Sequence, residues 1–178
     1  MTIKNIIEHA ADYGFTSAAE LDPSTIECKT QVRDMCAACK AYGTTWICPP
    51  ACGEIEECDA RVHAYAHGVI VQTTGQLEDE LDGEGMMETA AKHGESFKNY
   101  YKKLRESFKG ESMLALGAGG CVRCAKCTYP DAPCRFPDEQ QSSMEAYGMV
   151  ISEVCKNNGV PYYYGRSTIT YVSCYLFK

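Results

Sequence analysis

The chain has 178 residues, of which 45% are hydrophobic and 23% charged, and this balance predicts one globular domain with a real hydrophobic core. Its formal net charge of −7 argues against nucleic acid as a partner, because nucleic-acid-binding proteins need a basic face. The start of the chain is amphipathic and carries no signal-peptide pattern, and no apolar run is long enough to span a membrane. We therefore expect a cytoplasmic protein without a membrane partner.

Cysteine is the unusual residue of this composition, since the chain has 12 of them. In the reducing cytoplasm, clustered cysteines are more often metal ligands than disulfides. Nine of the cysteines fall into two loops, at about residues 36–58 and 121–137. These two cysteine-rich loops are the predicted cofactor-binding and metal-binding site.

The first segments alternate helix and strand. Apolar residues recur at helical spacing over residues 3–13, and Gly14 is expected to end that helix. A short strand is predicted over residues 15–21, followed by a turn at Asp22-Pro23. Residues 25–32 show no clear pattern.

The first cysteine group contains five candidate ligands for four places: Cys36, Cys39, Cys48, Cys52 and Cys58. A Cys-x2-Cys pair supplies two adjacent ligands, and Pro49-Pro50 stiffens the loop that presents the next ones. We favour the first four cysteines, with Cys58 as the alternate because it falls at the start of a predicted helix. Trp46 and Tyr42 are expected to cover the site and exclude water.

The middle of the chain predicts a helix that ends at Gly68, a buried strand over residues 69–74 and an acidic loop over 75–85. His63 and His67 have the spacing of a chelating pair, but we interpret them as helix-surface residues because no glutamate partner lies between them. A long amphipathic helix is expected over residues 86–108. A strand over residues 112–117 then leads into the second cysteine group.

The second cysteine group follows a known iron–sulfur pattern. Cys121, Cys124 and Cys127 match the bacterial Cys-x2-Cys-x2-Cys run, whereas Cys134 comes later than that pattern requires. The glycines before Cys121 permit close approach of the backbone to a bulky cofactor. Arg123, Lys126 and Arg135 place positive charge beside an anionic cluster. Zinc is the alternative metal, but zinc ribbons use two separated Cys-x2-Cys knuckles, so the spacing favours a cluster.

The C-terminal segments complete an α+β domain. Ser142 or Ser143 is expected to cap a helix, with Glu145 three residues after Ser142 as in a capping box, and a further helix is expected over residues 149–157. Residues 161–165 and 167–177 are predicted to pair as a hairpin. The expected fold is a single α+β domain, residues 1–178, with a small mixed sheet of about five strands, packed helices and the two cysteine-rich loops.

The motifs resemble those of DUF2284, a family of predicted metal-binding prokaryotic proteins. The matching residues are Cys36-x2-Cys39, Tyr42-Gly43, Trp46-x-Cys48-Pro49-Pro50, Gly120-Cys121-x2-Cys124-x2-Cys127, 133–137 and 143–148. The resemblance runs from about Val32 to the C-terminus. It implies metal binding and, with this ligand pattern, an iron–sulfur protein of anaerobic or redox-active prokaryotes. It leaves the reaction open.

The leading hypothesis is a protein that holds two [4Fe-4S]-type clusters and exchanges electrons with a redox protein donor or acceptor. The sequence contains no nucleophile–base constellation, phosphate loop or dinucleotide-binding fingerprint, so whether it is an enzyme stays open. One alternative is an enzyme whose open iron binds a small molecule, assisted by Arg135, Glu145 or Tyr147. The other is a zinc-binding scaffold. It also stays open whether Cys134 completes its own cluster or the other one.

Overall fold

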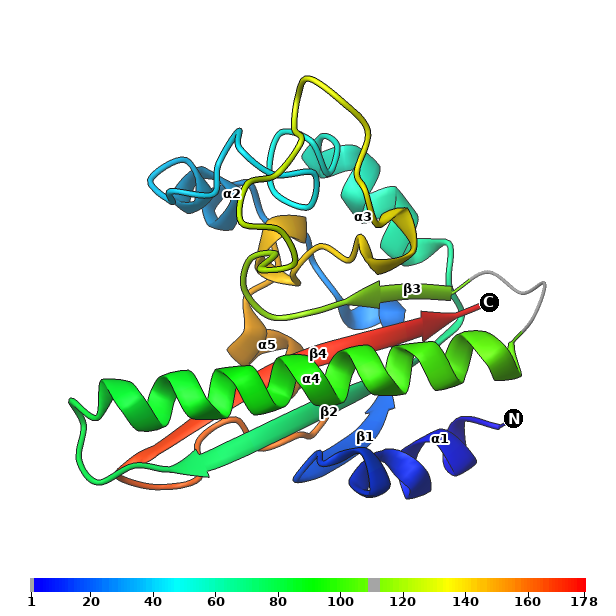
Figure 1. The fold of residues 1–178 in the computed structure, drawn as a ribbon. Helices are drawn as coiled ribbons and strands as arrows, with labels where there is room; N and C mark the ends of the chain where they lie inside the picture. Colours follow the sequence, from blue (N-terminus) through cyan, green and yellow to red (C-terminus); the bar gives the residue numbers. More distant parts are fainter. Residues whose placement is uncertain (1, 109–112) are drawn as a thin grey trace.

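The computed structural model describes residues 2–108 and 113–178. A four-stranded sheet forms its centre, in the order β1 (Ser17–Leu21), β2 (His67–Gln76), β4 (Thr168–Phe177) and β3 (Met113–Leu116) (Figure 1). Every neighbouring pair is antiparallel. The α+β class and the predicted strands at these places are confirmed, but the expected mixed sheet of about five strands is wrong.

The missing strand is the segment at residues 161–165. Pro161 has no N–H to donate to a sheet, and its carbonyl instead accepts a hydrogen bond from Gln72 Nε2 at 2.8 Å. The Tyr164 hydroxyl donates to the Oε1 of the same glutamine at 2.6 Å. A buried side chain therefore holds this segment against the sheet, and the predicted hairpin does not form.

Alternation along the two long strands gives the sheet two apolar faces. On β2, Val69 and Val71 belong to one buried cluster and Ile70 to the other. On β4, Tyr175 lies in the first cluster and Leu176 in the second. Helices must cover both faces, and Figure 1 shows them doing so.

The first face is covered by α1 (Ile3–His9) with its 3-10 extension to Tyr13, and by the long helix α4 (Gly83–Ser107). The chain turns at Gly14 with φ of 93°, as predicted. Helix α4 begins three residues before the predicted start because Asp82 caps it, with its carboxylate accepting from the Gly85 N–H at 2.8 Å. The predicted acidic loop is correspondingly shorter.

The second face is covered by α3 (Ile55–His63), α5 (Ile151–Asn157) and a 3-10 turn at Glu145–Tyr147. Helix α3 ends at His63, and His67 is already the first residue of β2. The prediction that one helix continues to Gly68 is therefore wrong. Both histidines are exposed, but only His63 lies on a helix, so their interpretation as helix-surface residues is wrong for His67.

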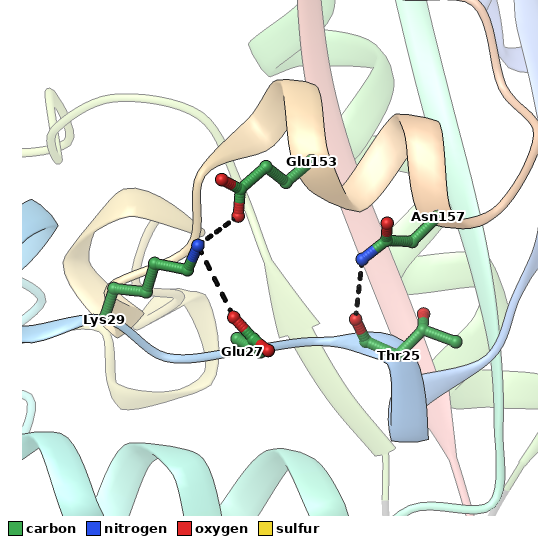
Figure 2. Close-up of polar contacts among 5 residues, drawn as sticks. All are labelled: Thr25, Glu27, Lys29, Glu153 and Asn157. Atoms are coloured by element: carbon green, nitrogen blue, oxygen red, sulfur yellow. Dashed lines mark hydrogen bonds and ion pairs between the residues drawn. The ribbon is translucent and has the colours of Figure 1, made fainter.

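A polar clasp positions the segment that leads to the first cysteine group (Figure 2). Lys29 forms ion pairs with Glu27, at 3.4 Å, and with Glu153 of α5. Asn157 Nδ2 donates to the Thr25 carbonyl at 3.2 Å. Helix α2 (Thr30–Cys36) follows directly, so this clasp fixes where Cys36 begins the cysteine-rich loop.

Gly148 should tolerate no side chain. Its φ is +81°, and an added Cβ would lie 2.6 Å from Ile55 Cδ1 and 2.9 Å from the backbone N and O of Lys29. We expect Gly148→Ala to lower the free energy of unfolding by about 2–5 kcal/mol, measured by urea denaturation. Gly159→Ala is the matched control: φ is +66° but nothing lies within 4 Å of the added Cβ, so about 1–2 kcal/mol is expected. Equal losses would contradict the close-packing argument.

Candidate metal centre

The second cysteine group lies in a long loop that is closed at its base. Gly117, at the end of β3, donates its N–H to the Ser142 carbonyl at 2.8 Å, and Met144 donates to the Gly117 carbonyl at 3.0 Å. The turn that follows is capped by Ser143, whose Oγ accepts from the Ala146 N–H at 3.1 Å. Ser143 is one of the two serines predicted to cap this segment, and the turn is a short 3-10 helix.

Trp46 joins the two cysteine-rich loops. Its indole N–H donates to the Ala132 carbonyl at 3.1 Å, and its own carbonyl accepts from Gln140 Nε2 at 3.2 Å. Its ring meets that of Tyr129 edge-on at a centroid distance of 4.9 Å. Figure 1 shows the two loops together beyond β3. Trp46 therefore lies between the two loops, whereas the exposed side chain of Tyr42 lies outside the cavity described next.

A cavity of about 420 Å³ opens between the loops. All four cysteines of the second group line it: Cys121, Cys124, Cys127 and Cys134. The first loop contributes residues 43–47 to the opposite wall. Within residues 2–108 and 113–178, no three Cys, His, Asp or Glu side chains already stand at metal-binding distance. The four cysteines of the second group thus line one cavity, but their thiols are not close enough together to hold a single metal ion in the described residues.

Backbone amides point at the sulfurs. Burial raises the pKa of Cys127, but N–H groups of Tyr129, Trp46 and Thr128, together with the charge of Arg135, outweigh it and lower that pKa. Two more sulfurs accept an amide: Cys134 from Phe136 at 3.4 Å and Cys39 from Ala41 at 3.5 Å. Such donors stabilise thiolates and are the usual environment of iron–sulfur ligands.

Cys48 lies where the two groups meet. Burial raises the pKa of its thiol, and the neighbouring sulfurs of Cys39, Cys121 and Cys127 raise it further. Those neighbours come from both loops. The first and second groups therefore form one continuous cysteine-rich region.

Cys36 has a different set of neighbours. Burial raises the pKa of its thiol, Arg33 lowers it, and Cys39, Cys48 and Glu145 raise it. The Oε2 atom of Glu145 and the Nε atom of Arg33 are both buried and have no hydrogen-bond partner among the residues that the structure describes. Buried polar atoms without partners are rare in native proteins and favour a bound ion nearby.

Cys52 and Cys58 lie apart from this cavity. Both are buried in the core of the second face, with 7% and 0% of their surface exposed. The Cys52 thiol donates to the Ala146 carbonyl, and the Cys58 thiol to the Cys52 carbonyl, each at 3.7 Å. The structure brings these two cysteines to each other. Whether either is a metal ligand stays a prediction.

The predicted positive charges have distinct partners. Arg123 stacks over the Phe136 ring at 4.0 Å and pairs with Glu139 at 3.0 Å. Arg135 donates to the Lys126 carbonyl at 3.0 Å, which orders the loop between the third and fourth cysteines. All three basic side chains line the cavity, as expected for residues beside an anionic centre.

Comparison with known proteins identifies a family. The family model described as predicted metal-binding protein (DUF2284) matches residues 19–177. No curated protein and no solved structure matches the chain. In the described part of the chain, no helix has the length and apolar composition to cross a membrane. The match covers most of the chain, and the protein belongs to the DUF2284 family of predicted metal-binding proteins.

Proposed function

We propose that this protein is a cytoplasmic electron-transfer protein that holds two [4Fe-4S]-type clusters and exchanges electrons with a redox protein partner. The observation that carries the proposal is the cavity of about 420 Å³ lined by Cys121, Cys124, Cys127 and Cys134. These four thiols are the proposed ligands of one cluster. Bound clusters of this kind supply one-electron transfer.

The proposed ligands of the first cluster include Cys36, Cys39 and Cys48. Its fourth ligand is predicted from sequence to be Cys52 or Cys58, but those two are engaged with each other in the core. The buried, unpartnered Oε2 of Glu145 lies by Cys36 and is a carboxylate ligand by chemistry. We assign it the fourth place.

Two features favour clusters over the zinc alternative. Four thiolates around one zinc ion lie about 2.3 Å from it and enclose little more than the ion, whereas the four cysteines here are part of the wall of a cavity of about 420 Å³. Amide N–H groups are also directed at Cys127, Cys134 and Cys39, and donors of this kind tune cluster potentials. The rings of Trp46 and Tyr129 meet edge-on at the cavity wall.

Metal analysis tests the proposal. Anaerobically purified protein should contain about eight irons and matching sulfide per chain, with a broad brown absorbance that bleaches with dithionite. Zinc content is measured on the same sample as the internal control. About two zincs per chain and a colourless protein would contradict the proposal and identify a structural scaffold instead.

A second cavity favours the enzyme hypothesis as the alternative function. A groove of about 650 Å³ runs between α4 and the loop 117–123 and reaches Cys121. Its walls carry small residues such as Ala90 and Gly94, so a small molecule has access beside the second cluster's ligands. Small carboxylates or thiols added to the reduced protein should then change its visible spectrum. An unchanged spectrum favours the plain electron carrier.

A further inference from the structure

Small residues on both sides leave open the groove of about 650 Å³ between α4 and the loop 117–123. Apart from the backbone next to each glycine, nothing in the described part of the chain lies within 4 Å of a Cβ added at Gly94, Gly119 or Gly120. Cys121 follows these glycines, and among the described residues it is the one cysteine that lines both this groove and the cavity of the cysteine loops. A molecule seated in the groove therefore lies beside a proposed cluster ligand.

The charged side chains that line the groove and the cavity are mostly basic. Five basic and two acidic residues line one or both, although the whole chain has 17 basic and 24 acidic residues. They are Lys98, Lys102, Arg123, Lys126, Arg135, Glu95 and Glu139. Arg123 already pairs with Glu139 at 3.0 Å. The surface around the second cysteine group is therefore positive, opposite in sign to the formal net charge of −7.

Two of these basic residues lie outside the cavity that the cysteines line. Arg123, Lys126 and Arg135 line that cavity, where they balance the charge of an anionic centre. Lys98 and Lys102 of α4 line only the groove. Within residues 2–108 and 113–178, neither lysine forms an ion pair with a carboxylate. Glu95 also lines the groove and offsets one of these charges, so positive charge remains for a partner.

The groove also presents an apolar side chain to solvent. Val122 comes directly after Cys121, lines the groove and is 84% exposed. Protein interfaces combine apolar contacts with a charged rim, and electron-transfer complexes need only a small area. An exposed valine beside basic residues of α4 and of the cysteine loop is the composition expected of such a contact.

We propose that this groove is the docking site of an acidic electron-transfer protein, which exchanges one electron with the site beside Cys121. The inference rests on the proposed function, because it names the kind of redox partner that the protein meets. The net charge of −7 repels an acidic partner over most of the surface, whereas the basic groove attracts it. The encounter is therefore oriented, with the partner placed at the second cysteine group.

Electron transfer to an oxidised rubredoxin tests the docking site. Rubredoxin is an acidic protein whose visible absorbance is lost when its ferric iron gains one electron and becomes ferrous. The holoprotein is reduced with dithionite, freed of excess reductant and mixed anaerobically with rubredoxin in about 0.1 M salt, where nearby charges dominate. The double variant Lys98→Glu, Lys102→Glu should lower the second-order rate constant about fivefold. The difference should largely disappear in about 0.5 M salt.

Two controls separate local charge from other effects. The double variant Lys4→Glu, Lys156→Glu makes the same change in net charge on exposed lysines of α1 and α5 that line neither the groove nor the cavity. It should change the rate with rubredoxin by less than about twofold. Cytochrome c is a basic acceptor, and the Lys98→Glu, Lys102→Glu protein should not reduce it more slowly than the unmodified protein does.

Iron analysis of each protein before mixing distinguishes the two ways in which this inference can fail. Unmodified protein without iron contradicts the proposed function and the docking site with it. If iron is present, an unchanged rate in Lys98→Glu, Lys102→Glu contradicts the docking site alone, as does an equal loss of rate toward rubredoxin and cytochrome c. A rate with rubredoxin that rises with salt in the unmodified protein also overturns the docking site, because it shows net repulsion.

Discussion

Cys124→Ser should reduce the iron and sulfide content to about half that of the unmodified protein, as expected if each cysteine group holds its own cluster. Cys124 is one of four cysteines around the cavity of about 420 Å³, and no other cysteine of the chain lines that cavity. A serine hydroxyl is a poor ligand for iron beside three thiolates. The measurement is iron and sulfide per chain in anaerobically purified protein, together with the visible absorbance.

Cys155→Ala is the matched control for this variant. Cys155 is also a free cysteine, but it is buried on α5, where its sulfur accepts a hydrogen bond from Gln72 Nε2 at 3.7 Å. Its loss should leave iron and sulfide unchanged. Full iron in Cys124→Ser would exclude Cys124 as a ligand. Complete loss of iron would indicate one shared centre and contradict two separate clusters.

The sequence predicted the fold where local pattern decides structure. The buried apolar run at residues 69–74 identified β2, the β-branched and aromatic residues of 167–177 identified β4, and Gly14 marked the end of the first helix. Strand β3 was also expected, because a short apolar run must lead into the loop before Cys121. In each case the residues that determine the element lie within it.

The fourth cysteine of the second group shows how a loop can alter an expected spacing. Cys134 follows the pattern too late in sequence, yet it lines the same cavity as the other three. Ala132 donates to the Thr128 carbonyl at 3.0 Å, and the Thr128 hydroxyl donates to the Pro133 carbonyl at 2.9 Å. This turn folds back the extra residues between Cys127 and Cys134. Cys134 therefore lies at the cavity although it comes later in the sequence than the pattern requires.

The remaining features depend on contacts between distant segments. The pairing of Gly117 with Ser142 and Met144 closes the second loop, and no local pattern encodes it. The sulfur of Cys58 accepts a hydrogen bond from Arg33, which lies 25 residues earlier in the chain. Spacing could therefore nominate five cysteines for the first site, but it could not separate Cys52 and Cys58, which lie in the core, from the other three.

A buried histidine should make the stability of the protein depend on pH. His93 of α4 is 1% exposed, and its ring nitrogens hydrogen bond to the hydroxyls of Thr73, at 2.9 Å, and Ser173, at 2.7 Å. Both contacts are satisfied by the neutral ring, and burial lowers its pKa to about 4. The unfolded chain binds this proton with a pKa of about 6.5.

The sign of the effect follows from these two values. Above pH 6.5 the ring is neutral in both states, so the full stability is present. As pH falls from about 6.5 to 4, the His93 ring binds a proton in the unfolded state but stays neutral in the folded state. The free energy of unfolding should therefore fall by about 3 kcal/mol. Urea denaturation of the protein between pH 8 and pH 4 measures this loss.

His93→Gln isolates that contribution. Glutamine can still hydrogen bond to Thr73 and Ser173 but has no proton to gain in this range. The variant will be less stable at pH 7 through imperfect packing, so the informative quantity is the difference in unfolding free energy between the two proteins at each pH. We expect that difference to be constant from pH 8 to 7 and to shrink by about 3 kcal/mol on acidification to pH 4. Because acid protonates the cluster ligands equally in both proteins, a difference that stays constant throughout would show that the His93 ring accepts a proton inside the fold.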